Sequence, residues 1–211
     1  MTMKERMTQG KLYRVDDALM EDLMRARRLL RLFNSTNEEQ GEYRTQLLRE
    51  LFGSMGEDVY VEPTFRCDYG CNITVGNRFF ANYDCIILDV CPVTIGNNVM
   101  LGPRVGIYTP LHPLDADVRS TLVECGKPIE IGDDVWIGGN AVVNGGVQIG
   151  SGTVIGSGSV VTRSIPSGVL AAGNPCRVLR EITQEDAAYW KQQKVEFDRY
   201  ANSLNAEHTM D

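Results

Sequence analysis

The sequence predicts a mainly β protein whose chain winds into a parallel β-helix of six-residue sides, with helices at both ends. Aliphatic residues recur at every sixth position without a gap, and they are Ile131, Ile137, Val143, Ile149, Ile155 and Val161. Small or β-branched residues follow the first five of these by four positions, and they are Val135, Ala141, Val147, Thr153 and Ser159. A coil with three flat sides places all of these side chains inside, with glycine or asparagine at corners where φ is positive.

Other regular structures fit this pattern less well. Six residues advance an α-helix by about 1.7 turns, so a helix would scatter the aliphatic side chains over two faces. A flat strand would not carry Gly, Asn, Asp and Ser at every intervening corner. A sandwich of short strands is the alternative, but it would not keep an unbroken period through six positions.

Composition narrows the class of protein. The 211 residues suffice for one or two domains with a substantial core, and a net charge of −7 indicates no broad basic surface for nucleic acid. No stretch approaches the roughly 18 apolar residues of a membrane span, and Met1–Gly10 lacks the apolar core of a secretory signal. We therefore expect a cytoplasmic protein that binds neither membranes nor nucleic acid.

The six cysteines are expected to be reduced thiols. A chain of this length has enough core residues to fold without disulfides, and its start shows no export signal. Cys67 and Cys71 are not followed by a second cysteine pair at a ligand spacing, and the two histidines are His112 and His208. No metal site is therefore predicted.

Residues 1–58 are predicted to form an N-terminal segment that contains two helices, the first over residues 11–33. Apolar residues recur at intervals of three and four between residues 11 and 33, and they are Leu19, Leu23, Ala26, Leu30 and Phe33. The first helix is expected to end at Asn34–Asn37. A second helix is expected over Glu38–Phe52 and should end at Gly53.

Residues 59–182 are predicted to form the β-helix. Two further sets of aliphatic residues keep the six-residue spacing but are offset from each other by two positions. They are Val75, Ala81 and Ile87, and Ile95, Leu101 and Ile107. We interpret the offset as an insertion near Asp89–Pro92. The period stops at Tyr108 and resumes at Ile129, so residues 109–128 are expected to leave the coil as an excursion, which in a solenoid is commonly functional.

Residues 183–211 are predicted to form a C-terminal helix and tail. Thr183 has the side chain of an N-cap, and the chain is expected to fray from about Ser203. The apolar contacts of this helix are expected from Ala187, Tyr189, Trp190, Val195 and Phe197.

His112 is the candidate general base, because an imidazole titrates near neutrality. It lies in the excursion between two prolines, Pro110 and Pro113, which restrict the backbone. A hydroxyl that attacks a thioester loses a single proton, so one neutral imidazole suffices. An exposed loop histidine without a role is the alternative, and the sequence does not identify the partner that would orient the ring.

Six short motifs carry a more specific signal. They are Arg66–Gly70, Phe80–Tyr83, Leu88–Val90, Thr109–Pro113, Val135–Gly139 and Ala172–Pro175. Together they resemble the maltose and galactoside O-acetyltransferases, which are hexapeptide-repeat acyltransferases that use acetyl-CoA, and the resemblance covers roughly residues 5–182. It implies a left-handed parallel β-helix that works as a homotrimer. Active sites would lie between subunits, with the excursion of one chain reaching its neighbour.

The resemblance also implies roles on the acceptor side. His112 matches the histidine that deprotonates the sugar hydroxyl, and Asn82 matches an asparagine whose amide binds the sugar. Either Asp16 or Asp17 matches an aspartate that contacts the acceptor.

Three further positions bear on the substrates. Asp68 stands where the galactoside enzymes carry serine and Val90 where they carry aspartate, so both favour the maltose/glucose-type branch. Trp136 matches a tryptophan of the cofactor cleft, and we group it with the residues that surround the substrates. The alternative for Trp136 is a lid on the interior of the coil.

The positions that the resemblance assigns to acetyl-CoA are Gly139, Ser157, Thr162, Arg163, Arg177 and Arg180. Arginines at the end of the coil fit this role, because a protein of charge −7 needs local cations to receive the phosphates of CoA. Ordinary solvated charges are the alternative. Backbone N–H groups near Gly139 are candidates to stabilise the oxyanion of the tetrahedral intermediate.

The predicted activity is therefore acetylation of a sugar hydroxyl by direct attack on acetyl-CoA, without a cysteine intermediate or a metal. A γ-type carbonic anhydrase on the same coil would need a zinc site of three histidines, which one histidine in the body of the chain does not supply. A hexapeptide-repeat acetyltransferase for an amine or amino acid, or a non-catalytic trimeric binding protein, remain the alternatives.

Overall fold

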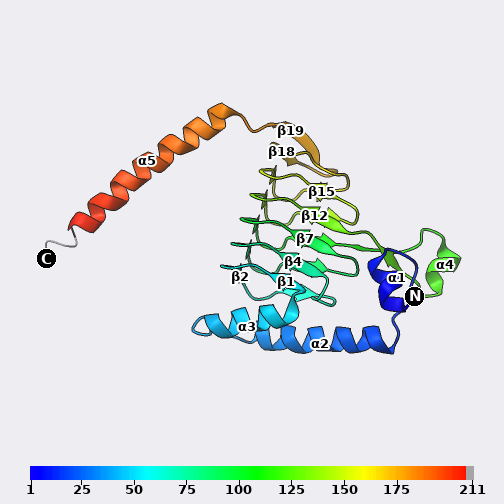
Figure 1. Ribbon diagram of the computed structural model, residues 1–211. Helices are drawn as coiled ribbons and strands as arrows, with labels where there is room; N and C mark the ends of the chain where they lie inside the picture. The colour runs from blue at the N-terminus through cyan, green and yellow to red at the C-terminus, as the bar shows by residue number, and fades with distance from the viewer. Residues whose placement is uncertain (208–211) are drawn as a thin grey trace.

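The computed structural model describes residues 1–207, and its centre is a three-sided column of parallel strands (Figure 1). The first face contains β1 (Ser54–Met55), β4 (Ile73–Val75), β7 (Val93–Ile95), β12 (Ile129–Ile131) and β15 (Gln148–Ile149). The second face contains β2 (Tyr60–Val61), β5 (Phe80–Ala81), β8 (Met100–Leu101), β13 (Trp136–Ile137), β16 (Val154–Ile155) and β18 (Val169–Ala172). The third face contains β3 (Arg66–Cys67), β6 (Ile86–Leu88), β9 (Gly106–Tyr108), β14 (Val142–Asn144) and β17 (Val160–Val161). The predicted parallel β-helix is confirmed.

The six-residue period decides which side chains lie inside the column. Neighbouring strands pair in register, so that Ile131 stacks between Ile95 and Ile149 on the first face. All six repeat positions from Ile131 to Val161 are buried, and so are the five small or β-branched residues that follow them by four positions. Each side therefore contributes one side chain from its strand and one from its corner to the core.

Corner glycines serve two different purposes. Positive φ occurs three positions after a repeat position, as at Asp134 with φ of 58° and Gly152 with φ of 69°. Gly132 directly follows a repeat position, and there a Cβ atom would lie 2.7 Å from the backbone nitrogen of Ser151 in the next coil. The expectation that corner glycines serve a positive φ is thus right for Gly152 and wrong for Gly132, where close stacking of the coils excludes a side chain.

Two helices cover the open end of the column at its first coil (Figure 1). They are α2 (Asp17–Asn34) and α3 (Gly41–Leu51), which correspond to the predicted helices but begin later. The side chains that they bury are Leu19, Ala26, Leu29, Leu30, Phe33, Leu47, Leu48 and Leu51. The predicted helix start at residue 11 is wrong, because Asp16 caps α2: its backbone is extended and its Oδ1 accepts the Leu19 N–H at 3.0 Å.

A short helix that was not predicted, α1 (Met3–Thr8), precedes α2 and lies beside the excursion (Figure 1). The excursion leaves the column at the corner between β9 on the third face and β12 on the first face. It contains β10 (Pro110–Leu111), α4 (Ala116–Ser120) and β11 (Cys125–Gly126), and β10 and β11 form an antiparallel pair. The insertion predicted near Asp89–Pro92 lies at the same corner one coil earlier, between β6 and β7.

The C-terminal end differs from the predicted packing. β19 (Arg177–Glu181) runs antiparallel to β18, and α5 (Gln184–Glu207) then extends away from the column (Figure 1). Thr183 caps α5 as predicted, since its Oγ1 accepts the Asp186 N–H at 3.3 Å. The expected apolar contacts are wrong for Tyr189, Val195 and Phe197, which remain exposed where α5 extends away from the column. Trp190 is also exposed, but it lines a pocket together with Trp136 of the second face.

The chain end predicted to fray from Ser203 is helical as far as Glu207, and the remainder of that prediction, with His208, lies outside the described residues. Within residues 1–207, no helix combines the length and the apolar character that crossing a bilayer requires.

Candidate functional site

The corner between the third and first faces, here called the excursion corner, carries His112. His112 is exposed and directly follows β10. The root of the excursion is fixed by Thr109, a fully buried residue whose Oγ1 donates to the Leu88 carbonyl at 2.8 Å and accepts the Cys91 N–H at 3.0 Å. The candidate base is therefore accessible to solvent but attached to a rigid part of the coil.

A buried carboxylate organises the same corner in the preceding coils. Asp89 is fully buried, and its Oδ1 accepts the N–H groups of Asp68 at 3.1 Å and Tyr69 at 2.9 Å. Its Oδ2 accepts the Asn72 N–H at 3.2 Å. Burial raises the pKa of Asp89, while these backbone donors act in the opposite direction. Asp89 thus holds the loop that presents Asp68.

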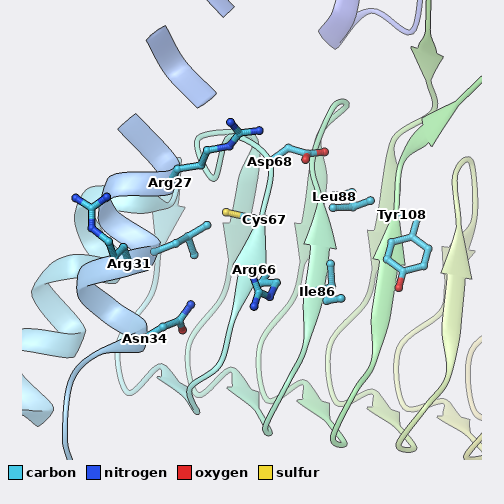
Figure 2. Close-up of a pocket in the computed structure, with 10 residues that line it drawn as sticks. Arg27, Arg31, Asn34, Arg66, Cys67, Asp68, Ile86, Leu88 and Tyr108 are labelled. Carbon is cyan, nitrogen blue, oxygen red and sulfur yellow. The ribbon is translucent and has the colours of Figure 1, made fainter. Parts of the chain in front are cut away.

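Asp68 lines a pocket of about 540 Å³ between α2 and the third face (Figure 2). The other residues that line it are Arg27, Leu30, Arg31, Asn34, Arg66, Cys67, Ile86, Leu88 and Tyr108. Figure 2 shows Arg27 and Asp68 at the same end of the pocket. The pKa of the Asp68 carboxyl is raised to about 6, first by burial and then by the charges of Asp89 and Glu124, whereas Arg27 lowers it.

The N-terminal segment reaches this corner from the other side. Tyr13 and Glu124 form an antiparallel bridge, with N···O distances of 3.0 and 3.2 Å, and the Tyr13 hydroxyl donates to Glu124 Oε1 at 2.6 Å. Asp16 and Asp17 follow as exposed residues, one capping α2 and the other beginning it. Capping of α2 therefore gives Asp16 a structural role at this position.

A second group of predicted residues lies at the corner between the second and third faces. Asn82 follows β5, Gly139 follows β13 and Ser157 follows β16 at this corner. Backbone hydrogen bonds between successive coils run along this corner. The Asn82 N–H donates to the Leu101 carbonyl of the next coil at 3.0 Å, and the Gly158 N–H donates to the Gly139 carbonyl of the preceding coil at 2.9 Å. A side of six residues separates this corner from the excursion corner by up to about 20 Å.

Trp136 points outward from the second face and is 50% exposed, so the alternative of a lid on the coil interior is wrong. It lines a largely apolar pocket of about 350 Å³ with Val154, Leu170, Arg180, Ile182, Asp186, Ala187 and Trp190. The Arg180 guanidinium donates to both carboxylate oxygens of Asp186, at 2.6 and 3.0 Å, and lowers the pKa of Asp186 to about 2. Arg180 is therefore already paired within its own chain.

The remaining predicted cofactor residues are all exposed. Thr162 and Arg163 follow β17 at the excursion corner, two coils beyond the excursion. Arg177 begins β19 and donates to the Cys176 carbonyl at 2.7 Å. One chain thus brings His112, Asp68, Asp16 and Asp17 to one region, and it does not bring Asn82, Gly139, Ser157 or Trp136 to them.

Several residues of the site gave no sequence signal. Glu124 and Tyr13 are 111 positions apart, and neither belongs to a motif. Arg27 and Arg31 enter the pocket beside Asp68 only because α2 lies across the third face, to which Tyr108 belongs. Asp89 had two signals in the sequence, its place in the insertion that interrupts the period and its place in the Leu88–Val90 motif.

No cluster of three or more His, Cys, Asp or Glu side chains suited to a metal occurs within residues 1–207. All six cysteines are free thiols. Burial raises the pKa of five of them, and they are Cys67, Cys71, Cys85, Cys91 and Cys176.

Comparison with protein families gives three matches along the chain. Residues 6–56 match the maltose acetyltransferase hexapeptide capping motif, and residues 128–163 match six repeats of the bacterial transferase hexapeptide. Residues 92–111 match the hexapeptide repeat of succinyl-transferase. The capping motif coincides with the segment that holds α2 and α3.

Individual relatives resemble the chain over most of its length. A maltose O-acetyltransferase from Clostridium difficile superposes with a TM-score of 0.86 and 53% identity, over 87% of this chain and 98% of its own. A galactoside acetyltransferase in complex with coenzyme A gives a TM-score of 0.86 and 42% identity, over 89% of this chain and 94% of its own. The galactoside O-acetyltransferase of Escherichia coli is 42% identical over 93% of this chain and 98% of its own length.

Proposed function

This chain belongs to the maltose and galactoside O-acetyltransferase family of hexapeptide-repeat enzymes, and we propose that it acetylates a hydroxyl of a glucose- or maltose-type sugar with acetyl-CoA. In this reaction His112 accepts the proton of the sugar hydroxyl while the oxygen attacks the thioester carbonyl. The C–S bond then breaks, the acetyl ester forms, and the CoA thiolate takes the proton from the imidazolium as it leaves.

The division of the predicted residues between two corners is the observation that carries this proposal. His112 and Asp68 lie at the excursion corner, whereas Asn82, Gly139 and Ser157 lie at the next corner of the column. A complete site therefore needs the excursion corner of one copy to meet the other corner of a second copy. A homotrimer with three such seams meets this requirement and uses every copy equally.

The pocket beside Asp68 supports a polyhydroxylated acceptor. It offers charged donors in Arg27, Arg31 and Arg66 and an acceptor in the Asp68 carboxylate, which are the groups that bind sugar hydroxyls. Val90 is buried at 2% exposure and packs with Leu19, so no polar contact to a galactoside comes from this position. These features favour a glucose- or maltose-type acceptor, with Asp16 or Asp17 as a further contact.

For acetyl-CoA we propose the seam where the corner of Gly139 and Ser157 in one copy meets the excursion corner of another copy. Trp136 lies on the face that adjoins the first corner, Arg163 lies at the excursion corner, and Arg163 and Arg177 would bind the phosphates. Thr162 adds a hydroxyl beside Arg163, and Arg180 would contribute while still paired with Asp186. Backbone N–H groups near Gly139 would stabilise the oxyanion. The coenzyme A complex of a relative at 42% identity supports the cosubstrate.

Direct transfer without a thiol intermediate is supported by the state of the cysteines. A raised pKa keeps a thiol protonated, and a protonated thiol is a poor nucleophile. Free thiols also fit a reducing compartment such as the cytoplasm.

A CoA-release assay with glucose, maltose and a β-galactoside tests the proposal. We expect turnover with the glucose-type sugars, and a loss of about 10²–10⁴-fold in His112→Ala, as is typical when a general base is removed. Because His112 is exposed, this variant should unfold at the same temperature as the parent. Asp117→Asn on the same excursion is the matched control and should keep its activity.

Near-normal turnover by His112→Ala would contradict the assignment. Release of CoA only with amines or amino acids would replace the sugar acceptor by a nitrogen one. Absence of any CoA binding would favour the non-catalytic alternative.

A further inference from the structure

We propose that Glu124, held by Tyr13, is a positioning residue that orients the imidazole of His112. This inference rests on the proposed function, since it assigns His112 the role of base. It identifies the partner of the ring, which the sequence left open.

The register of the excursion hairpin places Glu124 opposite His112. Pro110 pairs with Gly126 and Leu111 pairs with Cys125 in the antiparallel ladder of β10 and β11. Each step along one strand is matched by one step back along the other, so the next pair is His112 with Glu124. The base and the carboxylate thus stand across from each other where the ladder ends.

Tyr13 occupies the other side of Glu124. The two residues exchange both backbone hydrogen bonds, so the main-chain N–H and C=O of Glu124 point toward Tyr13 and away from His112. The His112–Glu124 pair is therefore of the non-hydrogen-bonded kind. In such pairs the side chains lie on the same face, with Cβ atoms about 4.5–5.5 Å apart.

The Tyr13 side chain identifies that face. Its hydroxyl donates to Glu124 Oε1 at 2.6 Å, so both side chains lie on one side of the ladder, and residues directly opposite Glu124 share this side. The bond occupies one carboxylate oxygen and leaves the second for an imidazole N–H. The Glu124 carboxylate thereby connects the buried hydroxyl of Tyr13 to the exposed imidazole of His112.

The chemistry of general-base catalysis explains why such a link is useful. A neutral imidazole must keep its proton on one nitrogen and present a lone pair on the other, and a carboxylate that accepts the N–H fixes this tautomer. The same carboxylate stabilises the imidazolium after proton transfer. Tyr13 is 2% exposed, and burial, followed by the hydrogen bond to Glu124, raises the pKa of its hydroxyl, so it remains a donor throughout the working pH range.

The groups around Glu124 define its electrostatic setting. Tyr69 lies near both Tyr13 and Glu124, and burial raises the pKa of its hydroxyl, so it too stays neutral. Asp68 is the other negatively charged neighbour that senses Glu124.

The test compares Glu124→Gln and Tyr13→Phe with the parent in steady-state assays. For Glu124→Gln we expect kcat to fall by about 10²-fold or more, with little change in the KM for the sugar or in the KM for acetyl-CoA. Tyr13→Phe should lower kcat by a smaller factor in the same direction. Glu130→Gln, an exposed glutamate of the first face, is the matched control and should behave as the parent.

A double-mutant cycle separates positioning from other roles. If Glu124 acts through His112, then Glu124→Gln should cost little in a His112→Ala background. An equal loss in both backgrounds, a loss confined to the KM of the sugar, or a wild-type kcat in Glu124→Gln would each overturn the inference. A fully active His112→Ala would instead overturn the proposed function, so the two failures are distinguishable.

Discussion

The repeating sides of the column and its excursion corner follow opposite rules. Along the sides, the chain returns to the interior every six residues, and most of the buried side chains are aliphatic. At the excursion corner the interval from Cys67 to Val75 and from Ile87 to Ile95 is eight residues, and the next coil inserts residues 109–128. Here the chain buries Asp89 and Thr109, which hydrogen bond to backbone. The regular sides therefore supply the apolar core, whereas the irregular corner supplies the polar side chains from which a site is built.

The largest effect on stability is expected from the sides. Ile131→Ala should lower the free energy of unfolding by about 2–5 kcal/mol, because it removes a buried side chain stacked between two coils and leaves a cavity. Chemical denaturation measures the change. Glu130→Gln, the outward neighbour, should differ from the parent by less than about 0.5 kcal/mol, and similar effects for both variants would erase the distinction between core and surface.

At the corner, Asp89→Asn is expected to cost about 1–3 kcal/mol of unfolding free energy, since an amide cannot accept all three backbone N–H groups. It should also lower turnover, because it loosens the loop that presents Asp68. Denaturation and CoA release on the same preparation measure both quantities. If Asp89→Asn had the same free energy of unfolding as the parent, the polar corner would contribute no more to stability than a surface loop does.

The corner should also respond to pH in a way that the sides do not. The pKa of Asp68 is raised to about 6 from an unfolded value of 3.8, so the folded protein binds the extra proton and loses stability as pH rises through about 4 to 6. Asp68→Asn should therefore be the more stable protein at pH 7.5, by on the order of 1 kcal/mol after allowance for solvent screening, and this advantage should vanish near pH 4.

Melting temperatures of both proteins at several pH values check this prediction. An advantage of Asp68→Asn that grew toward low pH would have the wrong sign and would refute the raised pKa.

The smallest effect is expected for a thiol of the same corner. Cys71 is half-buried and burial raises its pKa, so it is protonated near neutrality and takes no part in direct acetyl transfer. Cys71→Ala should keep kcat within about threefold of the parent, because protonated thiols are poor nucleophiles. Loss of activity in this variant, with an unchanged melting temperature, would assign chemistry to the thiol.

Elements with a strong period could be read from the sequence, whereas their junctions could not. The strands from Ile129 to Val161 follow the predicted spacing because each side must return an aliphatic residue to a common axis. The start of α2 differs from the predicted one, because Asp16 caps the helix and Tyr13 pairs with Glu124, and neither interaction changes the apolar spacing from Leu19 onward. The exposed aromatics of α5 were misread because amphipathic spacing does not reveal whether a partner is present.

By itself the sequence determined the parallel coil, the insertion at Asp89–Pro92, the excursion at 109–128 and His112 within it, because each is a local interruption or continuation of a fixed period. Only the tertiary structure decided which side chains meet at the excursion corner. Tyr13, Asp68 and Glu124 come together because coils stack in register and the N-terminal segment crosses them, and neither relation leaves a trace in local spacing.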